Sequence, residues 1–284
     1  MIMKHLNYIL TMALATIVVS SCAIRLDKKK VMESIDFADK YMLSASSVYV
    51  DKDSTFVSFR TLNFNGGDAI DCYRLVQSDS FKIRIHAPEN IIPLIAVELS
   101  DDGQLNIYRK KTDFASIKNI SSDIVVTVFA PSLDSIAIAG STDLECDAYK
   151  SPNALTISMS GSGDAEFGQL SVSSFSATMI GSAEMDIKFL KADIADISIS
   201  GSGNAKVSNM DVRNFKSMIA GSGDVKLEGG RAESADYNIA GSGSVDASEL
   251  ICGNTIYSIA GSGEVKYINS KGHVMKANRK GEEK

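Results

Sequence analysis

Three acidic side chains recur at multiples of 20 residues, namely Asp164, Glu184 and Asp224. If residues one repeat apart lie on neighbouring strands, Asp164 and Glu184 would lie about 5 Å apart, the strand spacing of a β-sheet. This is near the separation of the acid pair in retaining glycosidases, so the row is a candidate for polysaccharide lyase or hydrolase chemistry. Such an enzyme also needs a walled cleft, and the repeat contains no inserted loop to build one. We therefore favour a solvated polar face and keep the glycan-active enzyme as the alternative.

Other residue types that carry chemistry are scattered along the chain. After the N-terminal segment the histidines are His86 and His273, and their contexts differ, so neither a metal cluster nor a Ser-His-Asp arrangement is indicated. Cys72, Cys146 and Cys252 are far apart and lack CxxC spacing, so they indicate neither a disulfide framework nor a zinc site. We predict no catalytic residue, no cofactor and no metal.

The N-terminus has the features of a secretory signal. A basic start is followed by an apolar run, Leu6–Val19, that is too short to span a membrane comfortably. Small residues then precede Cys22, as in a lipobox, so we predict residues 1–21 as a signal peptide and Cys22 as the lipidated mature N-terminus. Several acyl chains would anchor the protein durably. Ala23 stands where aspartate would favour inner-membrane retention, so the expected location is the outer membrane, at the cell surface or on the periplasmic face.

Charge limits the classes of partner. The chain has 29 Lys and Arg against 35 Asp and Glu among 284 residues, and it lacks Trp. A mildly acidic chain with interspersed charges has no electrostatic footprint for nucleic acid. The expected partners are the membrane, through the lipid on Cys22, and a protein, a glycan or a second copy of the chain.

A Gly-Ser-Gly-like motif recurs seven times in the second half of the chain, with a first spacing of 21 residues and later spacings of 20. This period is too short for a pair of helices and suits one coil of a parallel β-helix. We therefore predict an all-β fold, a parallel β-solenoid with about 20 residues per coil. The motifs begin at Gly140, Gly161, Gly181, Gly201, Gly221, Gly241 and Gly261.

Alternation around each motif indicates which side chains face the interior. Positions two before and four or six after the first glycine are mainly apolar and share parity, so they point to one side of a strand. Stacking would join them into apolar ladders, in which each buried side chain contributes about 1.5–3 kcal/mol. Cys146 falls in one ladder, which predicts a buried core residue. The ladder two positions before the glycine contains Ile138, Met159, Met179, Ile199, Ile219, Ile239 and Ile259.

The remaining segments are less regular. Residues 22–48 are expected as a tether or a short helix, because apolar residues recur there at helical spacing. Residues 49–134 have β patterns and turn signals, and they predict either irregular early coils or a β cap. The regular solenoid is expected over 135–268, followed by a polar tail over 269–284.

Small residues occupy the positions one and three before the glycine, which face outward by parity. They predict a flat, weakly charged contact strip along the solenoid. A protein, a second copy, a glycan or the N-terminal segment of the chain itself could cover it. The strip consists of Ser158, Ser160, Thr178, Ser198, Ser200, Ala220, Ala240, Ser258 and Ala260.

The segments Gln77-Ser78-Asp79, Phe81-Lys82-Ile83 and Leu105-Asn106-Ile107-Tyr108, followed by Pro131 and the Gly-Ser-Gly repeats, resemble the putative auto-transporter adhesin head GIN domain family. The resemblance covers about residues 55–268 and departs from the motif at Thr142 and Ala183. It implies a right-handed parallel β-helix with no established enzymatic activity, often in envelope lipoproteins. The expected function is that of a non-enzymatic cell-envelope lipoprotein that acts as an adhesin-like or scaffolding contact surface.

Overall fold

The computed structural model describes residues 42–65, 70–110, 116–118, 124–269 and 272–278. Leu43–Lys284 form one compact unit, which is described here on its own. Cys22, the predicted signal peptide and most of the predicted tether lie outside the described residues, and the described part of that tether begins with a short strand, β1 (Met42–Ser44). The described ranges include no helix with the length and hydropathy needed to cross a bilayer.

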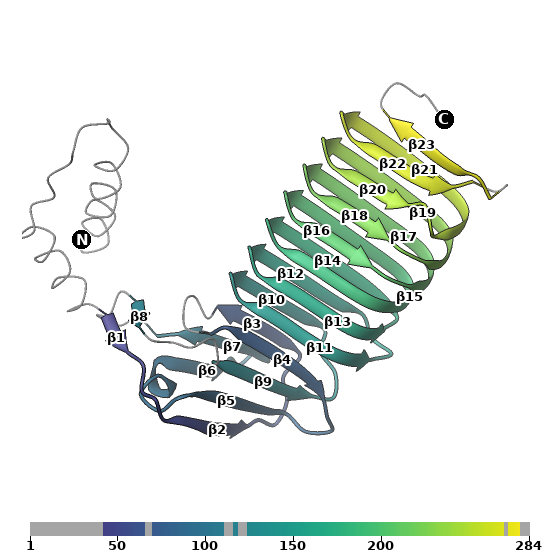
Figure 1. The fold of residues 1–284 in the computed structure, drawn as a ribbon. Coiled ribbons are helices and arrows are strands. Elements are labelled where there is room, and N and C mark those ends of the chain that lie inside the picture. The colour runs from purple at the N-terminus through teal and green to yellow at the C-terminus, as the bar shows by residue number, and fades with distance from the viewer. Residues whose placement is uncertain (1–41, 66–69, 111–115, 119–123, 270–271, 279–284) are drawn as a thin grey trace, which may run out of the picture. The chain divides into compact units, whose positions relative to one another are not determined.

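The regular part is a stack of coils in which every strand pairs in parallel with its equivalent in the next coil (Figure 1). Strands that lead into the glycine corner form the pre-glycine sheet: β10 (Ser135–Gly140), β12 (Leu155–Gly161), β14 (Ser174–Gly181), the second part of β15 (Glu184–Gly201), β17 (Met210–Gly221), β19 (Gly230–Gly241) and β21 (Ile251–Gly261). Strands that leave the corner form the post-glycine sheet: β11 (Asp143–Lys150), β13 (Asp164–Ser171), the first part of β15, β16 (Asn204–Val207), β18 (Asp224–Leu227), β20 (Ser244–Ala247) and β22 (Glu264–Ile268). The predicted all-β class and the parallel solenoid with about 20 residues per coil are confirmed.

The interior is built from the predicted ladders. In the pre-glycine sheet Met179 pairs with Ile199, Ile199 with Ile219, and Ile219 with Ile239, and all four side chains are buried. Cys146 pairs with Phe167 and is buried, as its place in the ladder predicts. Because each coil covers the core side chains of the coil before it, burial is continuous along the axis.

Each coil turns at a glycine for two physical reasons. Gly221 has φ of 140°, a conformation that side chains rarely adopt, and a Cβ there would lie 2.2 Å from the carbonyl oxygen of Gly201 in the coil below. That same oxygen accepts a hydrogen bond from the backbone N–H of Ser222 at 2.8 Å. The coils therefore touch backbone to backbone at this corner. At the position of the second glycine, Ala183 departs from the motif, yet the register of the neighbouring strands is unbroken.

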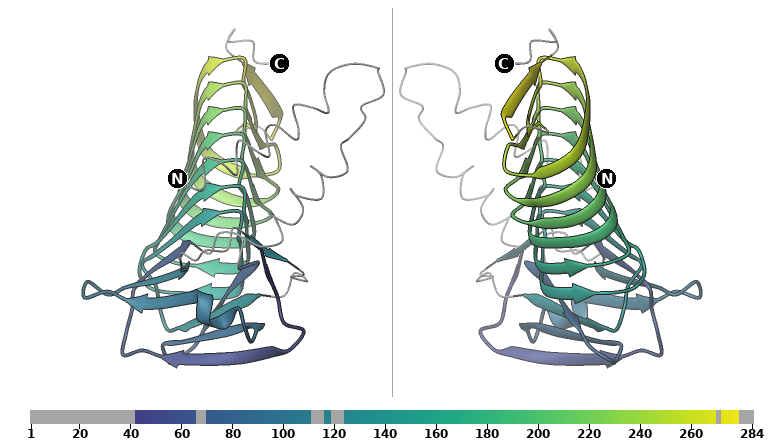
Figure 2. Two further views of the ribbon diagram at one scale, coloured as in Figure 1. Left: turned by 90° about the vertical axis from the view of Figure 1, so that its left-hand side faces the viewer. Right: turned by 90° about the vertical axis from the view of Figure 1, so that its right-hand side faces the viewer.

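The N-terminal region supplies both an early coil and a cap (Figures 1 and 2). The strands β3 (Thr61–Asn65) and β4 (Cys72–Gln77) pair in parallel beneath β10 and β11 and so continue the stack by one coil. Beneath them lie β7 (Gln104–Arg109) and β9 (Val125–Ala130), again in parallel, although they come later in the chain.

Antiparallel strands close this end of the stack. The strand β6 (Ile95–Leu99) pairs with β7, β5 (Lys82–Pro88) pairs with β9, and β2 (Tyr49–Thr55) pairs with β5. A 3-10 turn, η2 (Ile92–Leu94), connects β5 to β6, and β8 (Ser116–Lys118) pairs with β1 in a separate two-stranded sheet.

The C-terminal end of the solenoid is closed over one sheet. The strand β23 (Val274–Asn278) pairs antiparallel with β22, so residues 274–278 of the predicted polar tail form a strand. The last pre-glycine strand, β21, pairs with β19 and with no further strand of the described residues.

Candidate functional site

The acid row lies on the outer face of the post-glycine sheet, as predicted. Asp164 pairs with Glu184, Glu184 with Asn204, and Asn204 with Asp224, so Asn204 separates Asp224 from the other two acids. They line a shallow hollow of about 370 Å³ together with Lys206 and Lys226. Desolvation raises the pKa of Asp164, and the charges of Asp143 and Glu184 raise it further.

Side chains of this row bind the backbone of the next coil. The Asp164 N–H donates to Asp143 at 2.9 Å, the Asp224 N–H donates to Asn204 at 3.1 Å, and both the N–H and the hydroxyl of Ser244 donate to Asp224. Each of these acceptors therefore ties one coil to the one above it. Among the described residues, no group of His, Cys, Asp and Glu is suited to hold a metal ion.

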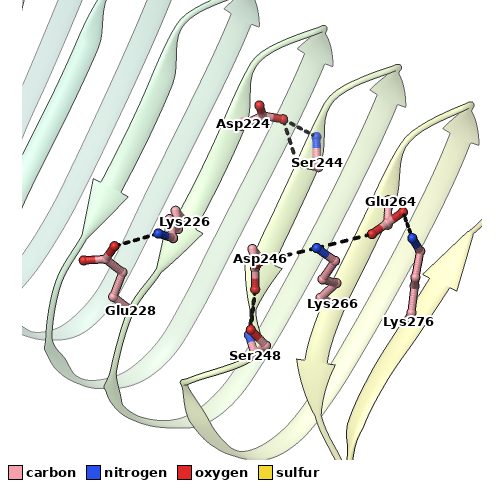
Figure 3. A network of polar contacts seen from close by, with 9 residues as sticks. All are labelled: Asp224, Lys226, Glu228, Ser244, Asp246, Ser248, Glu264, Lys266 and Lys276. Atoms are coloured by element: carbon pink, nitrogen blue, oxygen red, sulfur yellow. Dashed lines mark hydrogen bonds and ion pairs between the residues drawn. The ribbon is translucent and has the colours of Figure 1, made fainter. Parts of the chain in front are cut away.

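The basic residues beside the row are also paired (Figure 3). Lys206 and Lys226 both contact Glu228, at 3.1 and 2.8 Å, and hydrogen bonds to these lysines lower the pKa of Glu228. Figure 3 also shows Lys266 between Asp246 and Glu264, at 3.6 and 3.7 Å. The post-glycine face is thus a lattice of bonds between coils, in which Asp224 of the acid row has a structural role.

The predicted contact strip lies on the outer face of the pre-glycine sheet. Its side chains are exposed or half-buried, in agreement with the predicted parity. The same two rows also contain Ile180 and Met218, with 51% and 45% of their surface exposed, and Asn238. The strip is therefore less uniform than the prediction, which named only small residues.

A concave surface that the sequence prediction missed follows one corner of the solenoid through five coils. It lies where each post-glycine strand turns into the next pre-glycine strand, and we call it the corner groove. Its volume is about 940 Å³. The floor consists of five small or β-branched buried residues, one from each coil: Ser151, Val172, Ala192, Val212 and Ala232.

Two rows of outward side chains form the walls of the corner groove. One wall stacks in register and contains Lys150, Ser171, Lys191, Asp211 and Arg231. The other contains Ser173, Asp193, Arg213 and Glu233. Equivalent residues of adjacent parallel strands lie about 4.8 Å apart, so the walls present a polar group at each such step.

The charged wall residues pair along the axis. Asp211 accepts a hydrogen bond from Arg231 Nε at 2.7 Å and lies 3.5 Å from Lys191 Nζ, and the bond from Arg231 is the main reason for the lowered pKa of Asp211. Arg213 donates to Asp193 at 2.9 Å. The side chains of Arg213 and Arg231 remain 61% and 74% exposed. A guanidinium has five N–H donors, so both retain donors for a ligand.

A local break in alternation marks this corner. The pattern exposed–buried–exposed over Lys191, Ala192 and Asp193 is followed by a second consecutive exposed residue, Ile194. Two successive outward residues bend the strand away from the core and leave the small residue at the base of a concavity. The Gly-Ser-Gly motif lies at a different corner and gave no signal for this one.

Comparisons with known proteins agree with this fold. The chain matches the family model described as putative auto-transporter adhesin, head GIN domain, over residues 58–227 and 181–281. A putative lipid binding protein from Parabacteroides distasonis ATCC 8503 has 19% sequence identity and a TM-score of 0.65, over 80% of this chain and 100% of that chain. A search of curated proteins finds no match.

Two further solved structures are similar. A putative adhesin from Parabacteroides merdae ATCC 43184 has 19% identity and a TM-score of 0.61, over 80% of this chain and 99% of that chain. A putative adhesin from Bacteroides fragilis NCTC 9343 has 20% identity and a TM-score of 0.60, over 80% of this chain and 100% of that chain. At these identities the likeness shows the fold alone. The family model, however, spans most of the sequence, so the resemblance seen in the sequence is confirmed and the chain belongs to the family described as putative auto-transporter adhesin, head GIN domain.

Proposed function

We propose that the chain is an exported lipoprotein of the cell envelope that binds a linear glycan in the corner groove without cleaving it. The observation that carries this proposal is the corner groove itself, with a buried floor and one polar wall that run through five coils and a second polar wall that runs through four of them. A linear ligand matches this surface, because each of its successive units can meet polar side chains of one coil.

The wall chemistry suits a polyhydroxylated chain with acidic groups. Arg213 and Arg231 have N–H donors beyond those used in their ion pairs, and guanidinium binds carboxylate through paired hydrogen bonds. Asp193 and Glu233, on the same wall as Arg213, can accept hydrogen bonds from sugar hydroxyls. The absence of Trp from the chain means that sugar rings would rest on the aliphatic floor instead of an indole.

Binding without cleavage is favoured by the role of the acid row. Asp224 of this row, with Asp143 and Asn204 at the equivalent positions of other coils, accepts backbone hydrogen bonds from the next coil, so part of the row serves the fold. A glycan-active enzyme remains the alternative, and it predicts that the purified chain shortens an acidic polysaccharide. Product analysis after prolonged incubation, with an Asp164→Asn and Glu184→Gln double variant as control, separates it from the binding proposal.

The binding test uses the chain from Ala23 onward and a panel of linear acidic and neutral oligosaccharides, with affinities measured by calorimetry. Ser171→Trp places an indole on the groove wall and should abolish binding. Ser222→Trp places the same side chain at the glycine corner and should bind as the unmodified chain does. Equal binding by both variants, or binding of phospholipid vesicles alone, would reject a glycan site in the groove.

The envelope location rests on Cys22 and on family membership. A clickable fatty-acid analogue should label the chain in cells, and Cys22→Ala should lose the label. Proteolysis of intact cells against lysed cells then separates two roles. Cleavage on intact cells supports a surface adhesin, and protection until lysis supports a periplasmic scaffold on the outer membrane.

The contact strip supports a scaffolding role as a second candidate, because Ile180 and Met218 add apolar projections to a flat surface of small residues. Replacing Ser198 and Ala220 with lysine would place two charges at its centre without touching the core. Loss of a co-purifying envelope protein in this double variant, with glycan binding intact, would assign protein contact to the strip. An unchanged set of partners would remove the strip from consideration.

A further inference from the structure

The charged side chains of the corner groove alternate in sign from coil to coil along each wall. In the third, fourth and fifth coils of the groove, one wall, which we call the first wall, contains Lys191, Asp211 and Arg231. In the same three coils the second wall contains Asp193, Arg213 and Glu233. Each of these coils therefore has one cation and one carboxylate on opposite sides of the floor, and the cation changes sides at each step.

Ion pairs hold this arrangement along the solenoid axis. On the first wall, Asp211 lies 3.5 Å from Lys191 Nζ and 2.7 Å from Arg231 Nε. On the second wall, Arg213 lies 2.9 Å from Asp193. Among the described residues, no ion pair crosses the floor from one wall to the other. The walls are thus tied along the axis and left open across the groove, where a ligand would lie.

The floor between these walls is apolar. Ala192, Val212 and Ala232 are 7%, 4% and 6% exposed and bring no polar side-chain group into the groove. A pyranose ring has apolar C–H faces and a polar rim, so a ring that lies flat on this floor presents its rim to both walls. An extended pyranose unit has nearly the length of one coil spacing, about 4.8 Å. Each coil can therefore hold one sugar unit.

We propose, on the basis of the proposed glycan function, that the ligand is a linear β-(1→4)-linked polyuronate. In such a chain successive units are rotated by half a turn, so the carboxylates leave alternate edges of a flat ribbon. A pair of hydroxyls leaves the edge opposite each carboxylate. The carboxylates of three successive units would meet Lys191, Arg213 and Arg231. The hydroxyl pairs of the same units would donate to Asp193, Asp211 and Glu233.

The first two coils of the groove agree with this alternation. If a cation stands on the first wall in the third and fifth coils, the first coil should have its cation on that wall too, and Lys150 is there. The second coil has Ser171 and Ser173 on its two walls, which can bind either edge of the ribbon. An oligosaccharide of five units would fill the groove.

The first test measures the affinity of five-unit oligosaccharides by calorimetry, with the chain from Ala23 onward in calcium-free buffer. A β-(1→4)-linked oligoglucuronate should bind about tenfold more tightly than an α-(1→4)-linked oligogalacturonate. The two have the same number of carboxylates, but the α linkages bend the second chain away from a flat ribbon. A cello-oligosaccharide, which has the linkage of the first without its charges, should also bind about tenfold more weakly.

A charge exchange within the fourth coil tests the alternation itself. Asp211→Arg combined with Arg213→Asp keeps the composition and net charge of the groove but places all three cations of these coils on the first wall. The preference for the β-linked uronate should then be lost. The control is Arg74→Glu combined with Glu145→Arg, which exchanges an ion pair away from the groove and should keep the preference. Circular dichroism melts show whether each variant remains folded.

The outcomes separate this proposal from the glycan function on which it rests. Equal affinity for the α- and β-linked uronates, or an unchanged preference in the exchanged variant, would overturn the polyuronate assignment and leave the groove as a glycan site. Absence of binding by all three oligosaccharides, or binding that Ser171→Trp does not reduce, would reject the groove as a glycan site, and both proposals would fail.

Discussion

Replacing Gly221 with alanine tests whether backbone contact between coils, as well as backbone conformation, requires glycine at the corner. The φ of 140° lies outside the well that alanine tolerates, and holding a side chain there costs about 3 kcal/mol. The new Cβ would also lie 2.2 Å from the Gly201 carbonyl oxygen, so the two coils must move apart. That movement weakens the hydrogen bonds from Ser222 to Gly201 and from Ser242 to Gly221, each worth about 1 kcal/mol.

The expected loss for Gly221→Ala is therefore on the order of 5 kcal/mol, which corresponds to a fall in Tm of about 10–20 °C for a unit of this size. Gly103→Ala is the control. Gly103 has φ of 80° but no neighbouring atom within 4 Å, so the same substitution should cost about 1 kcal/mol and lower Tm by only about 2–4 °C. The Tm values of the two variants are compared by circular dichroism at a single heating rate. If both variants lose the same few degrees, close approach between coils is not what requires glycine at this corner.

Four further predictions concern buried polar groups and the groove. The Tyr149 hydroxyl accepts a hydrogen bond from the N–H of Leu133 and donates one to its carbonyl, so Tyr149→Phe should cost about 1–3 kcal/mol in urea unfolding. Tyr237→Phe, at a buried hydroxyl without a hydrogen-bond partner among the described residues, should be neutral or stabilising. Burial raises the pKa of the Cys146 thiol to about 12, whereas the unfolded thiol ionises near pH 8.5 to 9. Ionisation therefore favours the unfolded state, and the urea midpoint of unfolding should fall as pH rises from about 9 towards 12. The fall should be less steep in Cys146→Ala. Because the same thiol is buried, it should react with a disulfide reagent at pH 8 only after unfolding. Reaction of Cys146 in the native protein at the rate of an exposed thiol would contradict its position in the buried ladder. Arg213→Ala should weaken binding of an acidic oligosaccharide about tenfold with little change in Tm, whereas Arg74→Ala, in an ion pair away from the groove, should change neither.

The solenoid was predictable because a strict period encodes its own register. Once residues 20 apart are equivalent, Ile199 must lie over Met179, and parity alone then orients Cys146 inward and Ser198 outward. No long-range partner has to be identified, since every contact is between neighbouring copies of one pattern.

A β cap or irregular early coils were expected over residues 49–134, but the strand pairings of the cap and the corner groove were not predictable. The groove depends on two successive exposed residues, such as Asp193 and Ile194, and no repeated glycine marks that position. The cap has no period, and its pairings join β2 to β5 and β5 to β9 in antiparallel registers that only the folded chain defines. The hydrogen bonds of Tyr149 were not predictable either, because the sequence does not show which backbone groups a tyrosine hydroxyl contacts.

The chain order within the cap has a consequence for assembly. The strands β3 and β4 lie between β10–β11 on one side and β7–β9 on the other, and both neighbours are later in sequence. A chain that emerges from its N-terminus would therefore have no stable nucleus until Ala130 is available. After that point each coil pairs only with the preceding coil, so folding proceeds by local contacts that close short loops. A chain truncated before Ala130 should remain unstructured. A chain truncated after any later coil should form a shorter solenoid that is folded up to its last complete coil.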